Sequence, residues 1–347
     1  MTSKSKLFFI YSIIFILGKT LVANADTTNN DNSPILDSVN QEFINGLSSN
    51  DGPPIYKLTP TQARKVLSDI QAKSPPSMSK VDVEEKEISA DNTKFKLYIV
   101  RPKGNNKTLP AILYFHGGGW VMGDKDTHSR LINELACGVQ AAVIFVDYGR
   151  SPETQYPTPI NQAYAATKWV AENAKSINVN PSKLAVAGDS VGGNMAIAVT
   201  LLAKKAQSPK INFQLLFYPV TDSSFDTESY NKFANGPWLT KDAMKWFWDA
   251  YLPDVKARND ILASPLKASI DDLKGLPKAL VITDENDVLR DEGEAYARKL
   301  LQAGVKVTAT RYLGTTHDFV LFNAYADALP TRAAIAQAIA ELKEALK

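Results

Sequence analysis

Apolar residues along the chain fall into short strand-like runs that alternate with longer helical patterns. The strand-like runs cover residues 94–102, 111–115, 141–148, 183–188, 211–218, 278–283 and 305–313. The helical patterns lie near residues 60–73, 126–138, 159–174, 191–206, 291–303 and 330–346. Most of the strand-like runs are apolar throughout, which is typical of strands buried on both faces. This pattern predicts an α/β fold with a mostly parallel, doubly wound sheet and no second domain of equal rank.

Residues 222–265 interrupt this rhythm, because no strand pattern occurs within them. A helix is predicted inside this insert from apolar residues at i, i+3, i+4 and i+7, which are Met244, Phe247, Trp248 and Tyr251. Such an apolar stripe is typical of ordinary core packing. A long insert between two strands is also typical of a lid or a pocket wall.

The N-terminal residues have a composition of their own. A basic start, MTSKSK, is followed by the apolar run LFFIYSIIFILG and by the small residues Ala-Asn-Ala at 23–25. This order predicts a secretory signal peptide over residues 1–25 and an exported, periplasmic or secreted protein; the alternative is an uncleaved membrane anchor. After residue 25 no stretch is long and apolar enough to span a bilayer, so no stable membrane span is expected once the signal peptide is removed. Residues 26–55 are polar and predict a flexible lead-in.

Charge and cysteine content exclude several classes of protein. The 39 Lys and Arg residues nearly balance the 37 Asp and Glu residues, so no basic field is available to recruit nucleic acid. The single cysteine, Cys137, cannot form an intrachain disulfide. The expected partner is therefore a small molecule, and the sequence leaves a homodimer open.

A serine lies between glycines at the junction of a predicted strand and a predicted helix. Gly188-Asp189-Ser190-Val191-Gly192 matches the G-x-S-x-G nucleophile elbow, in which the turn holds the serine in a strained conformation. We expect the two glycines to be required because a Cβ at either position would clash in so tight a turn. The serine oxygen would then lie at the carboxyl edge of the sheet, beside a helix N-terminus that favours negative charge. The alternative is a glycine-rich packing turn.

A second glycine cluster, YFHGGGWVMG at residues 114–123, follows another predicted strand. Consecutive glycines allow backbone N–H groups to face a ligand, so the N–H groups of Gly117, Gly118 and Val191 are candidates for an oxyanion hole. A phosphate-binding loop is the competing interpretation, but neither the glycine spacing nor a following Lys-Ser/Thr supports it. His116 is expected to brace this loop.

A nucleophilic serine needs a base and an acid that orients it. His128 lies at the start of a predicted surface helix, whereas His317 lies in the loop after a predicted strand, where a base must be placed. Candidate acids follow the preceding strand, and they are Asp284, Glu285, Asp287, Asp291 and Glu292. Spacing alone does not choose among them. The order Ser, acid, His is that of the α/β-hydrolase fold.

These motifs together resemble the hormone-sensitive-lipase-like family of α/β-hydrolases, which includes many bacterial carboxylesterases. The matching stretches are HGGGW at 116–120, GDSVGG at 188–193, DVLRDEGEAYA at 287–297, the loop around His317, and GPWLTKDAMKWFWDAYLP at 236–253. The resemblance covers residues 55–345, approximately. It implies an α/β-hydrolase domain over residues 56–347, with a helical cap built from residues 56–80 and 222–265.

The resemblance also implies roles for individual residues. Ser190 would be the nucleophile, His317 the base and Asp287 the orienting acid, with Gly117, Gly118 and Val191 as oxyanion donors. The sequence departs from the family at Val191, where alanine is usual, at the GRS of residues 149–151, where arginine-leucine-alanine is usual, and at Asp318, where glycine is common. We expect these departures to affect specificity more than the class of reaction.

The sequence thus predicts an exported serine carboxylesterase that hydrolyses short- to medium-chain esters through an acyl-enzyme, and this chemistry needs no metal or organic cofactor. Two alternatives remain. An amidase or peptidase would carry the same triad, and a small-molecule-binding protein could use a hydrolase scaffold without catalysis. The second alternative is typified by the gibberellin receptor, which lacks the catalytic histidine, whereas His317 is present in this chain.

Overall fold

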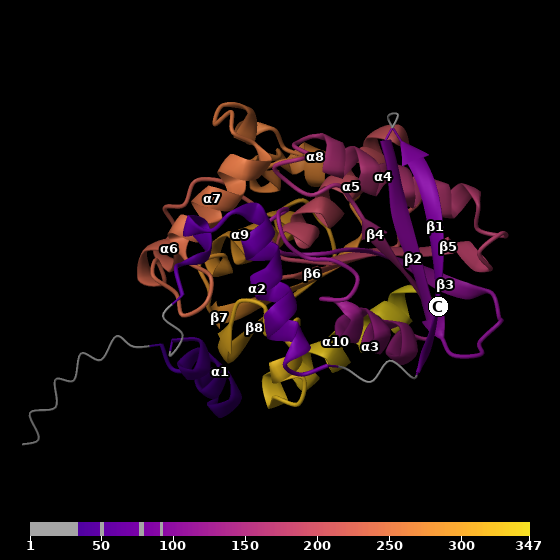
Figure 1. Ribbon diagram of the computed structural model, residues 1–347. Helices are drawn as coiled ribbons and strands as arrows, with labels where there is room; N and C mark the ends of the chain where they lie inside the picture. Colours follow the sequence, from indigo (N-terminus) through magenta and orange to yellow (C-terminus); the bar gives the residue numbers. More distant parts are fainter. Residues whose placement is uncertain (1–33, 49–51, 76–79, 91–92) are drawn as a thin grey trace, which may run out of the picture. The chain divides into compact units, whose positions relative to one another are not determined.

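The computed structural model describes residues 34–48, 52–75, 80–90 and 93–347 (Figure 1). Its strands are β1 Val81–Ala90, β2 Thr93–Pro102, β3 Leu109–Phe115, β4 Ala142–Asp147, β5 Val179–Asp189, β6 Phe213–Phe217, β7 Lys278–Asn286 and β8 Val307–Thr316. They form one eight-stranded sheet in the order β1-β2-β4-β3-β5-β6-β7-β8. β2 is antiparallel to both β1 and β4, and the other neighbouring strands are parallel.

Helices of different length connect and flank these strands. The α-helices are α1 Ser38–Ser48, α2 Pro60–Ala72, α3 Ser129–Val139, α4 Thr158–Glu172, α5 Val191–Ala206, α6 Glu228–Lys232, α7 Lys241–Tyr251, α8 Ile270–Leu273, α9 Arg290–Gln302 and α10 Leu329–Ala345. Short 3-10 helices are η1 Ile55–Lys57, η2 Ala257–Asn259, η3 Pro265–Lys267 and η4 Asn323–Tyr325.

The central strands are covered on both faces. α3 packs with α10 on one side of the sheet, and α4 packs with α5 on the other side (Figure 1). All residues of β6 are buried, and so are nearly all residues of β3, β4 and β7. The continuous apolar runs in the sequence follow from this double cover, because almost no position on these strands faces water. The predicted α/β fold with a mostly parallel sheet is therefore confirmed.

Two elements differ from the prediction. The flexible lead-in over residues 26–55 was inferred from polar composition, but helix α1 occupies Ser38–Ser48 within it. Asn40 of α1 is fully buried and accepts a hydrogen bond from the N–H of Thr316, 3.3 Å away. The ring of Phe43 packs against Phe322 and Tyr325. A few apolar residues among many polar ones are enough to hold this helix on the domain.

Strand β1 was not predicted from the sequence. Half of its sequence, VDVEEKEISA, is charged, and several of its glutamates pair with lysines, as Glu87 does with Lys94. β1 lies at the edge of the sheet and pairs with β2 through its backbone, so charged side chains can point to solvent. A hydrophobic pattern therefore does not reveal it.

The predicted signal peptide over residues 1–25 lies outside the described residues. Within the part of the chain that the structure describes, no helix combines the length and the apolar character needed to cross a membrane.

Candidate active site

Ser190 lies at the tight turn between β5 and α5. Its backbone has φ 55° and ψ −120°, which is a strained conformation for a residue with a side chain. A Cβ on Gly188 would lie 2.3 Å from the backbone of Gly192, and a Cβ on Gly192 would lie 2.0 Å from the carbonyl oxygen of Phe115. The predicted need for both glycines is confirmed, because the start of α5 packs directly against the backbones of β5 and β3.

His317 contacts Ser190, and Asp287 contacts His317, both from loops at the carboxyl edge of the sheet. Nε2 of His317 lies 3.0 Å from Oγ of Ser190, and Nδ1 lies 2.8 Å from Oδ2 of Asp287. The second oxygen of Asp287 accepts a hydrogen bond from the N–H of Leu289 at 3.0 Å, which fixes the carboxylate. The structure thus brings together the serine, histidine and acid that the family resemblance implied.

The charge around His317 favours its protonated form. Burial lowers the pKa of this imidazole, but the carboxylates of Asp287 and Asp318 outweigh burial and raise the pKa to about 9. The ring of Tyr218 packs edge-on against the imidazole, with centroids 4.7 Å apart. An imidazole with acids on two sides is well suited to stabilise the positive charge that it gains when it takes a proton from serine.

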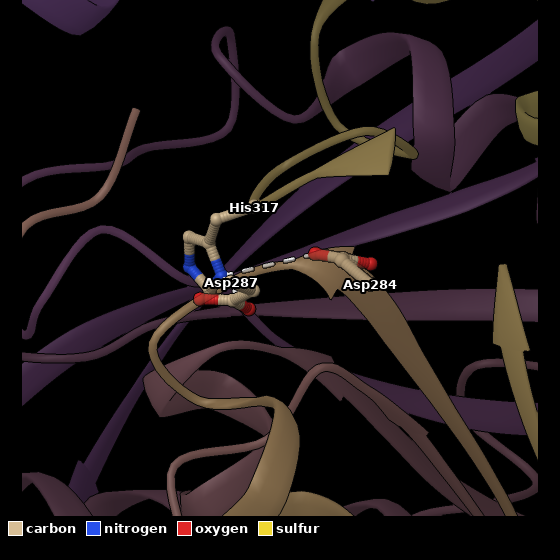
Figure 2. Close-up of side chains that lie close together, drawn as sticks. All are labelled: Asp284, Asp287 and His317. Atoms are coloured by element: carbon tan, nitrogen blue, oxygen red, sulfur yellow. Dashed lines mark hydrogen bonds and ion pairs between the residues drawn. The ribbon is translucent and has the colours of Figure 1, made fainter. Parts of the chain in front are cut away.

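The five candidate acids differ in the groups that they contact. Asp284 is fully buried at the end of β7, with one oxygen 4.0 Å from Nδ1 of His317 (Figure 2). Three more acids accept hydrogen bonds from backbone N–H groups away from His317. These pairs are Glu285 with Gly314, Asp291 with Ser229, and Glu292 with Thr221. Only Asp287 makes a hydrogen bond of normal length to His317 among these five acids.

The cluster in Figure 2 also has donor atoms that a metal ion could use. Asp284, Asp287 and His317 each offer one ligand atom, and these atoms lie within 4.8 Å of one another. Both ring nitrogens of His317 are already engaged, Nδ1 by Asp287 and Nε2 by Ser190. We therefore interpret the cluster as an acid–histidine arrangement that serves the serine.

The glycine loop after β3 differs from the prediction by one residue. The N–H of Gly117 donates to Oδ1 of Asp189 at 3.1 Å, so Gly117 is not available as an oxyanion donor. Gly118 and Gly119 have φ of 98° and 65° and line the cavity beside Ser190. Among the described residues, the N–H groups of Gly118 and Gly119 have no acceptor. The N–H of the predicted donor Gly117 is thus already bonded to Asp189, while those of Gly118 and Gly119 remain free among the described residues.

His128 has a role that the sequence did not reveal. It was expected on a surface helix, but it is fully buried, and its Nε2 lies 3.3 Å from Oδ2 of Asp189. Burial lowers the pKa of His128, but the carboxylate of Asp189 outweighs burial and raises it. Tyr114 also donates to Asp189 at 2.6 Å. The residue before the nucleophile therefore joins β3, the glycine loop and the start of α3 into one buried network.

His116 braces the glycine loop, as the sequence predicted. Its Nδ1 lies 2.9 Å from the carbonyl oxygen of Gly117, and its ring stacks on Tyr148 with centroids 4.1 Å apart. Burial, together with the nearby His128, lowers the pKa of His116 to about 3. A histidine that stays neutral in this way packs like an aromatic ring and takes no part in proton transfer.

A cavity of about 470 Å³ opens above the serine. Ser190, His317, Asp318, Gly118 and Gly119 line it from the sheet side. The opposite walls come from two segments distant in sequence: Ile55, Tyr56, Leu58, Val66 and Ile70 around η1 and α2, and Trp238, Leu239, Met244 and Phe247 around α7. The walls are mainly apolar, so the cavity is suited to an uncharged organic group.

Asp318 connects the cavity wall to the histidine. Its Oδ2 accepts a hydrogen bond from Nε1 of Trp238 at 2.9 Å, and its Oδ1 lies 3.7 Å from Nε2 of His317. Burial raises the pKa of Asp318, and the neighbouring His317 opposes this change. The residue that departs from the family pattern therefore places a carboxyl group at the bottom of the cavity.

Comparisons with known proteins agree with this geometry. Residues 112–321 match a family described as alpha/beta hydrolase fold. The chain is 37% identical over 280 residues to the carboxylesterase NlhH of Mycobacterium tuberculosis, covering 80% of this chain and 87% of that protein. It is 33% identical over 276 residues to an ethyl acetate hydrolase of Pseudomonas putida, covering 77% and 85% of the two chains.

Solved structures give the same result. A thermostable esterase from Pseudomonas putida ECU1011 superposes with a TM-score of 0.89 at 53% identity, covering 91% of this chain and 99% of that one. An esterase from the fungus Rhizomucor miehei superposes with a TM-score of 0.84 at 44% identity, covering 90% and 97%. The chain therefore belongs to the α/β-hydrolase family, in its hormone-sensitive-lipase-like branch, and is a carboxylic ester hydrolase.

Proposed function

We propose that this protein is an exported serine carboxylesterase that hydrolyses short- to medium-chain esters through a Ser190–His317–Asp287 triad. The observation that carries the proposal is the pair of distances at His317. Nε2 lies 3.0 Å from Oγ of Ser190, and Nδ1 lies 2.8 Å from Asp287. This is the arrangement in which an imidazole takes the proton of a serine hydroxyl while a carboxylate holds its other nitrogen.

Acylation begins when Oγ of Ser190 attacks the ester carbonyl and its proton passes to Nε2 of His317. The carbonyl oxygen becomes an oxyanion, which the N–H groups of Gly118, Gly119 and Val191 stabilise. The carbonyl re-forms as the C–O bond to the alcohol breaks, and His317 returns its proton to the leaving alkoxide. Asp287 holds the imidazole in the correct tautomer and stabilises its positive charge throughout.

Deacylation repeats the same steps with water. His317 removes a proton from the water molecule as its oxygen attacks the acyl carbon, and the same N–H groups stabilise the second oxyanion. The bond to Oγ of Ser190 then breaks, the serine takes back its proton from His317, and the carboxylic acid leaves. Every proton passes through Nε2 of His317, so no cofactor is required by this route.

The size and lining of the cavity favour an ester whose acyl or alcohol group is small. A volume of about 470 Å³ holds a small ligand, and its walls are mostly apolar. We propose that the segments 56–80 and 222–265 together act as a cap over the serine, because residues from both line the cavity. The carboxyl group of Asp318 at the bottom of the cavity favours uncharged over anionic esters.

The proposal is tested with a series of nitrophenyl esters of increasing acyl length and a nitroanilide control. We expect turnover of the shorter esters and little cleavage of the anilide. Ser190→Ala should abolish turnover and covalent labelling by an organophosphate, while circular dichroism shows an intact fold. Ester turnover by a pure Ser190→Ala preparation would contradict the mechanism, and efficient anilide cleavage would favour an amidase.

Export is proposed from the N-terminal sequence alone. A basic start, an apolar run and small residues at 23–25 have the order of a cleavable signal peptide. N-terminal sequencing of protein recovered outside the cytoplasm should find a start at or near Asp26. Recovery of exported protein that still begins at residue 1 or 2 would contradict cleavage.

A further inference from the structure

Asp284 is a buried carboxyl that the mechanism above does not use. It lies near the end of β7, three residues before Asp287, and none of its surface is exposed. Its oxygens meet no N–H or hydroxyl donor among the described residues, and its one hydrogen bond, to the carboxyl of Asp287, needs a proton on one of the two acids. An unpaired buried carboxylate is strongly disfavoured, so this group needs a physical explanation.

Among the residues that the structure describes, one group near Asp284 could compensate a negative charge. Nδ1 of His317 lies 4.0 Å from Oδ2 of Asp284, but Asp287 already occupies that nitrogen at 2.8 Å (Figure 2). The other titratable groups that interact with Asp284 are acids or phenols, and they are Asp287, Asp318, Tyr218 and Tyr325. Burial raises the pKa of Asp284 well above its usual range, and the carboxylate of Asp287 raises it further.

We propose that Asp284 is a second positioning acid of the triad, neutral beside Asp287 in the resting enzyme and able to take over Nδ1–H of His317 when Asp287 carries no charge. This inference rests on the proposed function of His317 as the base. Two carboxyls that face one imidazole cannot both ionise in a buried site, so the pair holds one proton between them. The carboxyl nearer to Nδ1 carries the negative charge, and the one at 4.0 Å carries the proton.

The substitution Asp287→Asn changes this balance. The amide is neutral, so the like-charge repulsion that disfavoured ionisation of Asp284 is lost. Asp284 can then ionise and accept the proton of Nδ1 across a distance that needs only a small movement from 4.0 Å. Without a second acid, removal of the triad carboxylate costs about 10⁴-fold in kcat. With Asp284 present, we expect the loss to be nearer to about 10³-fold.

A double-mutant cycle tests this coupling. Asp284→Asn in the native background should lower kcat about threefold, because a neutral amide replaces a neutral carboxyl of the same shape. In the Asp287→Asn background the same change should lower kcat about 30-fold further. The ratio of the two effects, about tenfold, is a coupling within the range measured for neighbouring groups. Asp147→Asn is the matched control in both backgrounds. Asp147 is a half-buried carboxyl at the end of β4 whose pKa is also raised by burial, and its effect should be additive.

The pH profile supplies a readout that loss of packing would not change. In Asp287→Asn, kcat/KM should rise with pH along a limb that reports ionisation of Asp284, and this limb should be absent from the double variant. Equal rates and equal profiles for Asp287→Asn and the double variant would overturn the proposal. Asp287→Ser replaces Asp287→Asn in the cycle if the asparagine variant does not fold. A Ser190→Ala variant that still turns over ester would instead refute the triad itself.

Discussion

Replacing Asp318 by asparagine should move the pH dependence of ester hydrolysis toward lower pH. Oδ1 of Asp318 lies 3.7 Å from Nε2 of His317, and with Asp287 it raises the pKa of this imidazole to about 9 against the effect of burial. His317 must be neutral to accept the proton of Ser190, so activity is lost as the pH falls through this pKa. A raised pKa therefore places the acid limb of the profile at high pH, and removing one of the two carboxylates should lower it.

The size of this change follows from the distance. Two unit charges separated by 3.7 Å interact by about 1.1 kcal/mol in a medium as polar as water and by about 4.5 kcal/mol at an effective dielectric constant of about 20. One pKa unit corresponds to about 1.4 kcal/mol, so these limits correspond to changes in pKa of about 0.8 and about 3. The side chains of His317 and Asp318 are only 4% and 12% exposed, so we expect the acid limb to move down by about 1 to 3 pH units.

The assay is the pH profile of kcat/KM for an uncharged ester, followed by acid release in a pH-stat. The native enzyme should require alkaline pH for full activity, and Asp318→Asn should reach its plateau at lower pH. Asp69→Asn is the matched control, because Asp69 also lines the cavity but pairs with Lys65 rather than with His317. An acid limb that stays in place or moves to higher pH in Asp318→Asn would refute the electrostatic argument, as would an equal change in Asp69→Asn.

Two further predictions concern the support of the site. Gly192→Ala should lower the free energy of unfolding by about 1–3 kcal/mol in a denaturant titration, because the new Cβ would lie 2.0 Å from the carbonyl oxygen of Phe115. Gly52→Ala is the control and should have little effect, because its Cβ would contact nothing within 4 Å. Arg130→Lys should lower kcat about tenfold with a smaller change in KM. The guanidinium of Arg130 donates to the backbone carbonyls of residues 320–322, just after His317, and a lysine ammonium cannot keep that geometry. Unchanged stability in the first variant, or unchanged kcat in the second, would contradict these arguments.

The fold was predictable because burial leaves a direct trace in the sequence. Strands covered on both faces are largely apolar, and the buried runs within β3 to β7 show this. The elbow was predictable for a similar reason, since close backbone packing at Gly188 and Gly192 admits only glycine. Strand β1 and helix α1 have weaker hydrophobic patterns in the sequence. β1 is held by backbone pairing at an edge, and α1 by a few apolar contacts within a polar segment.

The oxyanion loop was predictable only in outline. Three consecutive glycines allow several N–H groups to turn inward, and nothing in the run itself says which of them face the serine. The choice is made by Asp189, which accepts the N–H of Gly117 and leaves the next two N–H groups for the cavity. His128 was misplaced for the same reason. Its partner, Asp189, lies 61 residues away, and a helix pattern around residue 128 contains no information on that contact.

The acid of the triad shows what sequence spacing can and cannot decide. Asp284 lies near the end of β7 and Asp287 directly follows it, so both reach the carboxyl edge of the sheet. The pairing of β7 with β8 becomes irregular between Asp284 and Asn286. The choice rests on a difference of 1.2 Å, between contacts of 2.8 Å and 4.0 Å to one nitrogen. Burial then amplifies this small difference. Because a buried pair of carboxyls holds only one negative charge, the nearer group becomes the anion and the other is kept neutral. A geometric difference that no spacing rule can resolve thus becomes a nearly complete separation of chemical roles.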